Sequence, residues 1–173
     1  TEPRNLYTAP PKCLNYKNLP QCRGDGIQSR VITSFQTAKV CAPPEQILCV
    51  LGMHRSGTSC LTGSLEEAGL HMGDIHTWNP HNLKGNRENQ KIVDINDRVL
   101  ASAGAAWDNP PNTDISWCAS DLDVAGELFA SYAGQSPFGF KDPRTLLTLP
   151  GWKQLLPHMR YIGIFRHPLA VAR

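Results

Sequence analysis

The amino-acid sequence predicts an α/β domain with a central parallel sheet. Short apolar runs of strand length alternate with segments whose apolar residues recur at helical spacing. Each apolar run is followed by, or ends in, a glycine or a charged residue, as expected of buried parallel strands that lead into loops. The strands are expected at 47–51, 138–141 and 161–165, and the helices at 56–69, 88–103, 120–132 and 152–156.

The first half of the pattern is a strand, a helix and a long loop. The run 47–51 is apolar throughout and is followed by Gly52, and the helix behind it stops at Gly69. Residues 71–85 are rich in His, Asn, Pro and Gly, which predicts a loop. Loops of this length commonly have a functional role.

The second half contains amphipathic helices and two further strands. The helix at 88–103 has one apolar face, and Ser120 is a plausible N-cap for the helix at 120–132. Three tryptophans are expected to pack in the interior, with the alternative that one of them borders a substrate pocket: Trp107, Trp117 and Trp152.

Composition limits the domain organisation and the partners. With 173 residues and 40% hydrophobic residues, the chain is long enough for one domain with a core, expected at 45–173. Residues 1–44 hold six prolines and predict an irregular lead-in, with one peripheral strand within 30–40. A net charge of +2 does not favour general nucleic-acid binding. Neither a membrane span nor a secretory signal is evident, so a cytoplasmic location is expected.

Cysteine and histidine positions do not favour a metal site. The six cysteines are expected to be reduced, although Cys13 and Cys22 leave open a local bridge or a metal half-site. His71, His76 and His81 lie five residues apart, a spacing that shares no helical or strand face, so they are expected to be solvated.

The strongest local signal is a glycine-bearing turn between the first strand and its helix. Gly52, Gly57 and Ser59 match the phosphate-binding pattern GxxxxGK[ST], but Thr58 stands where the lysine belongs. The positive charge is supplied instead by Arg55, inside the loop. A triphosphatase needs the lysine on the β and γ phosphates, so a nucleotide without a γ-phosphate is the better expectation.

Charged residues follow all three predicted strands. Arg55, Lys141 and Arg166 should converge, because ligands of open α/β sheets bind at the carboxyl ends of the strands. The amides of residues 56–59, at a helix N-terminus, would hold a phosphate there. The last apolar run ends in Arg166 rather than in a metal-binding aspartate, which further disfavours a magnesium-dependent triphosphatase.

These motifs together resemble the sulfotransferase family. The segment GMHRSGTS is similar to the family's 5′-phosphosulfate loop, and RYIGIFRHPLAVA is similar to its second nucleotide motif. In that motif the arginine, here Arg166, grips the 3′-phosphate of 3′-phosphoadenosine 5′-phosphosulfate (PAPS). The segment KDPR at 141–144 is also similar to one in tyrosylprotein sulfotransferases, where its lysine assists the transfer.

The resemblance implies a P-loop NTPase-like three-layer fold that is incomplete at the carboxyl end. It covers residues from about 47 to 173 and leaves the lead-in unexplained. The family motif continues to a serine one residue beyond Arg173, so a truncated domain is expected. Before Glu88, Asn86 and Arg87 stand where related bacterial-type sequences tend to have an aromatic residue or histidine.

The implied reaction is transfer of a sulfuryl group from PAPS to a hydroxyl acceptor, less often an amine, without a metal. Arg55 and Lys141 would stabilise the developing charge, and Glu88 would be the general base. An acidic residue in a helix's first turn is equally well explained by the helix dipole. The residues expected to bind the nucleotide are Arg55, Ser56, Gly57, Thr58, Ser59 and Arg166.

Two alternatives remain open at this stage. One is a P-loop phosphotransferase that depends on a nucleotide, and the other is a non-catalytic nucleotide-binding fragment. The acceptor is not defined by the sequence, and small alcohols, carbohydrates, lipids and protein tyrosines are all compatible with it.

Overall fold

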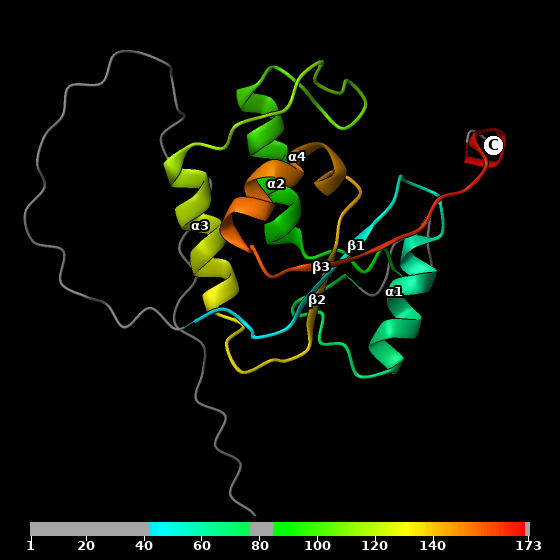
Figure 1. Ribbon diagram of the computed structural model, residues 1–173. Coiled ribbons are helices and arrows are strands. Elements are labelled where there is room, and N and C mark those ends of the chain that lie inside the picture. Colours follow the sequence, from blue (N-terminus) through cyan, green and yellow to red (C-terminus); the bar gives the residue numbers. More distant parts are fainter. Residues whose placement is uncertain (1–41, 77–84, 172–173) are drawn as a thin grey trace, which may run out of the picture.

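The structure is a computed structural model, and it describes residues 42–76 and 85–171. Within these residues, consecutive strands are separated by one or more helices, as Figure 1 shows. In chain order they are β1 (Ile47–Leu51), α1 (Thr58–Glu67), α2 (Gln90–Ser102), α3 (Ala119–Ala130), β2 (Phe138–Lys141), α4 (Thr145–Leu155), β3 (Arg160–Gly163) and α5 (Pro168–Val171).

The three strands form one parallel sheet in the order β2-β1-β3. In the central strand, Cys49 is paired with Phe140 of β2 on one side and with Tyr161 of β3 on the other. The predicted α/β class with a parallel sheet is therefore confirmed. Because all strands run the same way, their carboxyl ends lie at one edge of the sheet.

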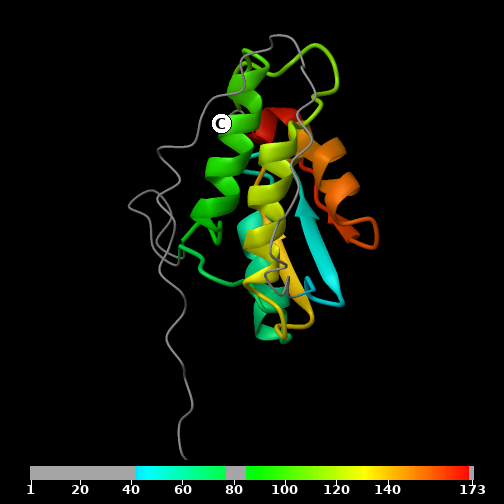
Figure 2. The same cartoon turned by 90° about the vertical axis from the view of Figure 1, so that its left-hand side faces the viewer.

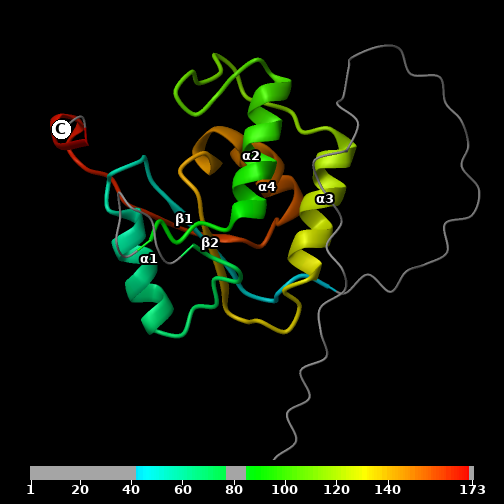
Figure 3. The ribbon, with the colours of Figure 1, turned by 180° about the vertical axis from the view of Figure 1, so that it is seen from behind.

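The helices fall into two groups. Helices α2, α3 and α4 pack on one another, whereas α1 packs against β1 and β2. Figures 1 and 3, which view the molecule from opposite sides, both show α1 apart from the other three helices. Figure 2, turned by 90° from Figure 1, shows the neighbouring helices α2 and α3 beside the sheet. The sheet thus has one large helical cluster and one helix that follows the β1 loop.

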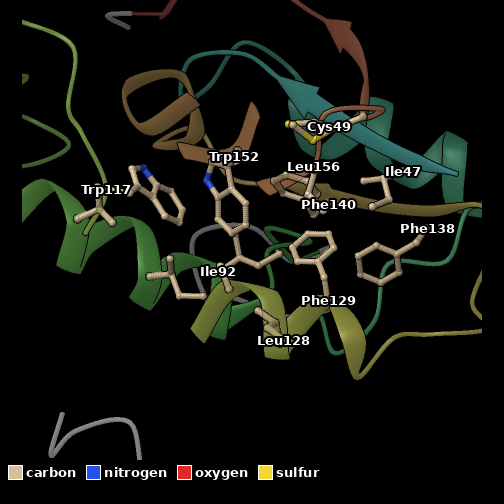
Figure 4. Close-up of a cluster of buried hydrophobic side chains, with 14 of the residues drawn as sticks. Ile47, Cys49, Ile92, Trp117, Leu128, Phe129, Phe138, Phe140, Trp152 and Leu156 are labelled. Atoms are coloured by element: carbon tan, nitrogen blue, oxygen red, sulfur yellow. The ribbon is translucent and has the colours of Figure 1, made fainter. Parts of the chain in front are cut away.

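The core lies between the sheet and the helical cluster. Phe129 of α3 packs with Phe138 and Phe140 of β2 and with Trp152 of α4, at ring-centroid distances of 5.4–5.7 Å. All four side chains are at most 1% exposed, and Figure 4 shows them lying together. Burial of aromatic rings of this size stabilises the fold strongly, and it fixes β2 against the helices.

A polar group, Asn96 of α2, lies inside this helical cluster. Its fully buried amide donates to Asp142 Oδ2 at 2.8 Å and accepts hydrogen bonds from Thr148 Oγ1 at 2.7 Å and Trp152 Nε1 at 2.9 Å. A buried amide is tolerated when its donors and acceptors are satisfied, as they are here. Asn96 therefore ties α2 to α4 and to the turn that follows β2.

Several predicted boundaries were wrong. Helix α4 begins at Thr145 rather than at 152, because Thr145 and Thr148 turn their hydroxyls inward to Asn96. Helix α3 has Cys118 at its N-cap, so Ser120 lies inside the first turn. β3 ends at Gly163 and not at 165.

The tryptophans differ from one another. Trp117 and Trp152 are buried, as predicted, and the Trp117 Nε1–H donates to the Thr148 carbonyl at 3.0 Å. Trp107 is 47% exposed, so the prediction that it packs in the interior was wrong. It lies in a turn after α2 that is closed by hydrogen bonds between Ala106 and Asn109.

Some predictions concern residues outside the described ranges. These are the lead-in at 1–41 with its strand, the part of the long loop at 77–84, and Cys13, Cys22 and His81. Within the described part, Cys49 and Cys60 are free thiols, the Cys118 thiol donates to Asp121 Oδ2 at 3.0 Å, and His71 and His76 are exposed. Among the helices of this part, none has the length and apolar character needed to cross a membrane.

Candidate functional site

A cavity of about 790 Å³ lies where the loops after the three strands meet. Most of the predicted site residues line it, although they come from four separate segments of the chain. They are Arg55, Gly57, Thr58, Ser59, Glu88, Lys141 and Arg166. The convergence follows from the parallel sheet, which places the residues after β1, β2 and β3 at one edge.

The loop after β1 is a tight turn. The Ser56 amide donates to the Met53 carbonyl at 3.2 Å, and the Ser56 hydroxyl donates to the same oxygen at 2.6 Å. Arg55 has a left-handed backbone, with φ 62°, which is uncommon for a residue with a side chain. Ser56 is 5% exposed and does not line the cavity, so its hydroxyl holds the loop together.

Gly52 allows the loop to pack closely against the end of β3. A Cβ atom at this position would lie 2.6 Å from Thr58 Cγ2 and 2.7 Å from the Ile164 carbonyl oxygen. Such distances are far below van der Waals contact, and the carbonyl belongs to the backbone. A side chain at position 52 would therefore separate the loop from the segment that leads to Arg166.

Helix α1 begins at this loop without a side-chain cap. Its N-cap, Gly57, has φ 101°, a conformation that glycine adopts without strain. The first amides of a helix have no carbonyl partner within the helix, and they carry partial positive charge. The amides of Thr58 and Ser59 are therefore donors suited to an anion.

Lys141, at the end of β2, crosses the cavity to the segment before α2. Its Nζ donates to Glu88 Oε1 at 2.6 Å and to the Asn86 carbonyl at 2.9 Å. Ser59 Oγ donates to the same carbonyl at 3.1 Å. The side chains of Lys141 and Glu88 are 3% and 13% exposed, so this ion pair is buried. Lys141 thus ties the 86–88 segment to β2, and the Ser59 hydrogen bond ties the same segment to α1.

Glu88 lies just before helix α2. The helix begins at Gln90 and is capped by Asn89, whose side chain accepts a hydrogen bond from the Lys91 amide at 3.0 Å. Glu88 therefore precedes the first turn, in which the sequence placed it. Its carboxylate is paired with Lys141 beside the helix N-terminus, so a catalytic role and a structural role both stay predictions.

The residues after Lys141 are held in place by two ion pairs of Arg144. Arg144 Nη1 donates to Asp142 Oδ1 at 3.0 Å, and Arg144 Nε donates to Asp97 Oδ1 at 2.7 Å. Asp142 is fully buried and also accepts from Asn96. Burial lowers the pKa of Arg144, but the neighbouring carboxylates Asp142 and Asp97 outweigh that effect and raise the pKa. These ion pairs position the Arg144 guanidinium at the same cavity that Lys141 lines.

Arg87 forms another wall of the cavity. Its guanidinium pairs with Glu66 of α1, and it lies so close to Gly63 that a Cβ there would be 3.1 Å from Arg87 Nε. The residue has φ 54°, a second left-handed backbone beside the cavity. Such strain persists only where the surrounding contacts enforce it, which here are the contacts to α1.

Arg55 and Arg166 differ from these cations. Both are exposed, both line the cavity, and neither has an acidic partner among the residues that the structure describes. Lys141, Arg87 and Arg144 are each neutralised by a carboxylate. The lining thus includes two exposed arginines without an ion-pair partner in the described ranges, together with one exposed carboxylate, Glu67. Two such cations favour an anion with more than one charged group.

His54 lines the cavity too, although it was not among the residues predicted from the sequence. It is half-buried, its ring lies 5.1 Å from that of Trp107, and its Nε2 is buried without a hydrogen-bond partner in the described residues. Burial lowers the pKa of His54. Arg144 and Lys141 lower it further, whereas the carboxylates of Glu88 and Asp142 oppose the change. The imidazole is therefore held neutral at physiological pH.

No metal centre is evident around the cavity. Within 42–76 and 85–171, there is no group of three or more His, Cys, Asp or Glu side chains that could hold an ion. Cys49 lies within β1, where burial and the charge of Asp142 raise the pKa of its thiol and keep it protonated.

Comparison of the chain with protein families, with curated proteins and with solved structures finds no match in any of the three. The function is therefore argued from the resemblance of the motifs and from the geometry of the cavity.

Proposed function

We propose that the chain carries the nucleotide half of a sulfotransferase site, which transfers a sulfuryl group from PAPS to a hydroxyl. The observation that carries the proposal is a pair of exposed arginines, Arg55 and Arg166, which have no acidic partner in the described ranges and lie in one cavity with the uncapped start of α1. PAPS has phosphates at two ends of its ribose. Two separated anion-binding groups match that ligand better than they match a nucleotide with a single phosphate chain.

In this proposal the 5′-phosphosulfate lies on the loop after β1. The amides of Gly57, Thr58 and Ser59 bind it, and Arg55 adds charge. Arg166, which follows β3, binds the 3′-phosphate. The arrangement belongs to a P-loop-type three-layer fold, of which this chain would form the amino-terminal part.

The chemical step is an in-line displacement at sulfur. The acceptor oxygen forms a bond to sulfur while the bond from sulfur to the 5′-phosphate oxygen breaks, and that oxygen keeps the electron pair. Glu88 takes the proton of the acceptor hydroxyl. Lys141 has three N–H donors, of which Glu88 and Asn86 use two, so the third is left to stabilise the leaving oxygen.

The first test is calorimetry with adenosine 3′,5′-bisphosphate, the product nucleotide, in the presence of EDTA. Binding without magnesium, and stronger than that of adenosine monophosphate, is expected. Arg166→Ala should abolish the preference for the bisphosphate. Arg160→Ala is the matched control, because Arg160 is an exposed arginine at the opposite end of β3. Equal affinities for the two nucleotides in the unaltered chain would remove Arg166 from this role.

A second test follows the transfer itself with labelled sulfate from PAPS. The assay uses the chain extended beyond Arg173 and a panel of acceptors. Glu88→Gln should lower turnover by about 10²–10⁴-fold while nucleotide affinity changes little. A preference for adenosine triphosphate with magnesium would instead favour a phosphotransferase, and nucleotide binding without transfer would favour a non-catalytic fragment.

A further inference from the structure

The hydroxyl of Ser59 is engaged in a contact within the protein. Ser59 is the second residue of α1, and its Oγ donates to the Asn86 carbonyl at 3.1 Å. A serine hydroxyl has one proton to donate, and the oxygens of an ionised phosphate only accept. While this hydrogen bond is made, Ser59 can offer a phosphate its backbone amide but not its hydroxyl.

The Asn86 carbonyl is shared between two donors. Besides the Ser59 hydroxyl it accepts from Lys141 Nζ at 2.9 Å, and Lys141 Nζ also donates to Glu88 Oε1 at 2.6 Å. One carbonyl oxygen therefore joins the first turn of α1 to the ammonium group at the end of β2. A change at Ser59 alters the place of this carbonyl, and with it the place of Lys141.

Helix α1 holds the chain before α2 at a second point. The Arg87 guanidinium pairs with Glu66 and lies against Gly63, where a Cβ atom would be 3.1 Å from Arg87 Nε and 3.2 Å from Arg87 Cζ. The same stretch of backbone pairs with His76, whose amide donates to the Glu88 carbonyl and whose carbonyl accepts from the Arg87 amide, both at 3.1 Å. The backbone around Glu88 is thus held from several directions, and its position depends on α1.

These contacts link two parts of the proposed reaction. The amides at the start of α1 are the proposed donors to the 5′-phosphosulfate, whereas Lys141 and Glu88 are the proposed groups at the leaving oxygen and at the acceptor proton. Misplacement of a reacting group by about 1 Å can cost about 10²-fold in rate. A hydroxyl that sets the place of Lys141 relative to α1 therefore bears on the transfer although it does not touch the nucleotide.

We propose that Ser59 is a positioning residue, whose hydroxyl holds Lys141 through the Asn86 carbonyl instead of binding the 5′-phosphosulfate. This assignment differs from the expectation that the side chain of Ser59 binds the nucleotide. It rests on the proposed sulfuryl transfer for its effect on rate. The position of Lys141 itself can be measured without nucleotide and without transfer.

The first experiment measures the acetylation of lysines in the full chain by sulfo-N-hydroxysuccinimide acetate, followed by mass spectrometry. The Lys141 side chain is 3% exposed and is held by two acceptors, so it should react slowly compared with the exposed Lys153. Ser59→Ala should speed the reaction of Lys141 by about two- to tenfold, the equivalent of one hydrogen bond, and leave that of Lys153 unchanged. Ser59→Thr, which keeps the hydroxyl, should restore the slow reaction.

The second experiment separates positioning from phosphate binding. The affinity for adenosine 3′,5′-bisphosphate, which carries the 5′-phosphate, should change by less than about twofold in Ser59→Ala when measured by calorimetry with EDTA. Turnover of the extended chain should fall by about tenfold or more with the KM for PAPS kept, and Ser59→Thr should recover it. Ser64→Ala is the matched control, because Ser64 lies on the same helix, lines the same cavity and donates within the helix, to the Cys60 carbonyl at 3.4 Å.

The outcomes keep the two proposals apart. Unchanged acetylation of Lys141 in Ser59→Ala, or a loss of bisphosphate affinity by about tenfold or more in that variant, would overturn the positioning role. Unchanged turnover with normal bisphosphate affinity would overturn it as well. Absence of bisphosphate binding by the unaltered chain would instead overturn the sulfotransferase proposal, and the acetylation of Lys141 would still decide whether Ser59 holds it.

Discussion

Replacing Asn96 by alanine removes the centre of the hydrogen-bond network that joins α2 to α4. The amide is fully buried, and it is the one partner of the Trp152 Nε1–H among the described residues. It also donates to the buried carboxylate of Asp142 at 2.8 Å. The Asn96→Ala variant leaves the indole N–H unsatisfied, and it deprives Asp142 of a charge-assisted bond.

The two losses set the magnitude. A buried donor without a partner costs about 1–3 kcal/mol, and a hydrogen bond to a charged group contributes about 1.5–3 kcal/mol. Asn96→Ala should therefore lower the free energy of unfolding by about 2.5–6 kcal/mol, a large part of the 5–15 kcal/mol that is typical of a domain. The Thr148 hydroxyl is less affected by the loss of Asn96, because it can also donate to the Arg144 carbonyl, which lies 3.4 Å away.

Urea unfolding followed by far-ultraviolet circular dichroism measures the change. Asp94→Ala is the control, because Asp94 is an exposed residue of the same helix and should matter by less than about 0.5 kcal/mol. If Asn96→Ala does not fold, Thr148→Val tests the same network with an expected loss of about 1 kcal/mol. A loss below about 1 kcal/mol for Asn96→Ala, with an unchanged urea dependence, would refute the reasoning.

Three further predictions follow from the site. Gly52→Ala should lower stability by about 1–3 kcal/mol in a thermal melt, whereas Gly163→Ala, with no atom within 4 Å of its Cβ, should be neutral; equal effects would contradict the close-approach argument. Because the pKa of His54 is lowered in the folded state, its stabilising contribution should be complete above the unfolded value of 6.5 and be lost as the pH falls below it. The difference in free energy of unfolding between the unaltered chain and His54→Asn, measured by urea unfolding at several pH values, should therefore shrink as the pH falls below 6.5. A difference that does not change with pH would refute this. Lys141→Met should cost about 3–5 kcal/mol by leaving the Glu88 carboxylate buried alone, and a second change, Glu88→Gln, should recover part of the loss in a double-mutant cycle.

Much of the fold was predictable because its signals are local. The runs ILCVL and FGFK consist mainly of apolar residues, and both form strands at the predicted positions. The start of α4 was missed for a different reason. Thr145 and Thr148 read as polar surface residues, yet they are fully buried because Asn96, about fifty residues earlier in the chain, satisfies their hydroxyls.

The candidate site was likewise predictable only in part. Arg55, Lys141 and Arg166 were recognisable because each follows a strand, and parallel strands place such residues at one edge. His54 and Trp107 were not recognisable as a pair, since they are 53 residues apart and share no motif. The place of His54 in the glycine-bearing loop after β1 was the one signal available for this part of the cavity.

The sequence by itself determined the alternation of strands and helices and the residues that end the strands, because hydrophobic periodicity and glycine positions are properties of short segments. It also placed Arg55 and Arg166 after two of the strands, where we propose that an anion binds. Only the tertiary structure decided which charged groups are paired with one another and which side chains are in contact. It pairs Lys141 with Glu88, leaves Arg55 and Arg166 without acidic partners among the described residues, and sets Trp107 against His54. Charge compensation and burial depend on which distant side chains meet, and that is settled when the chain packs.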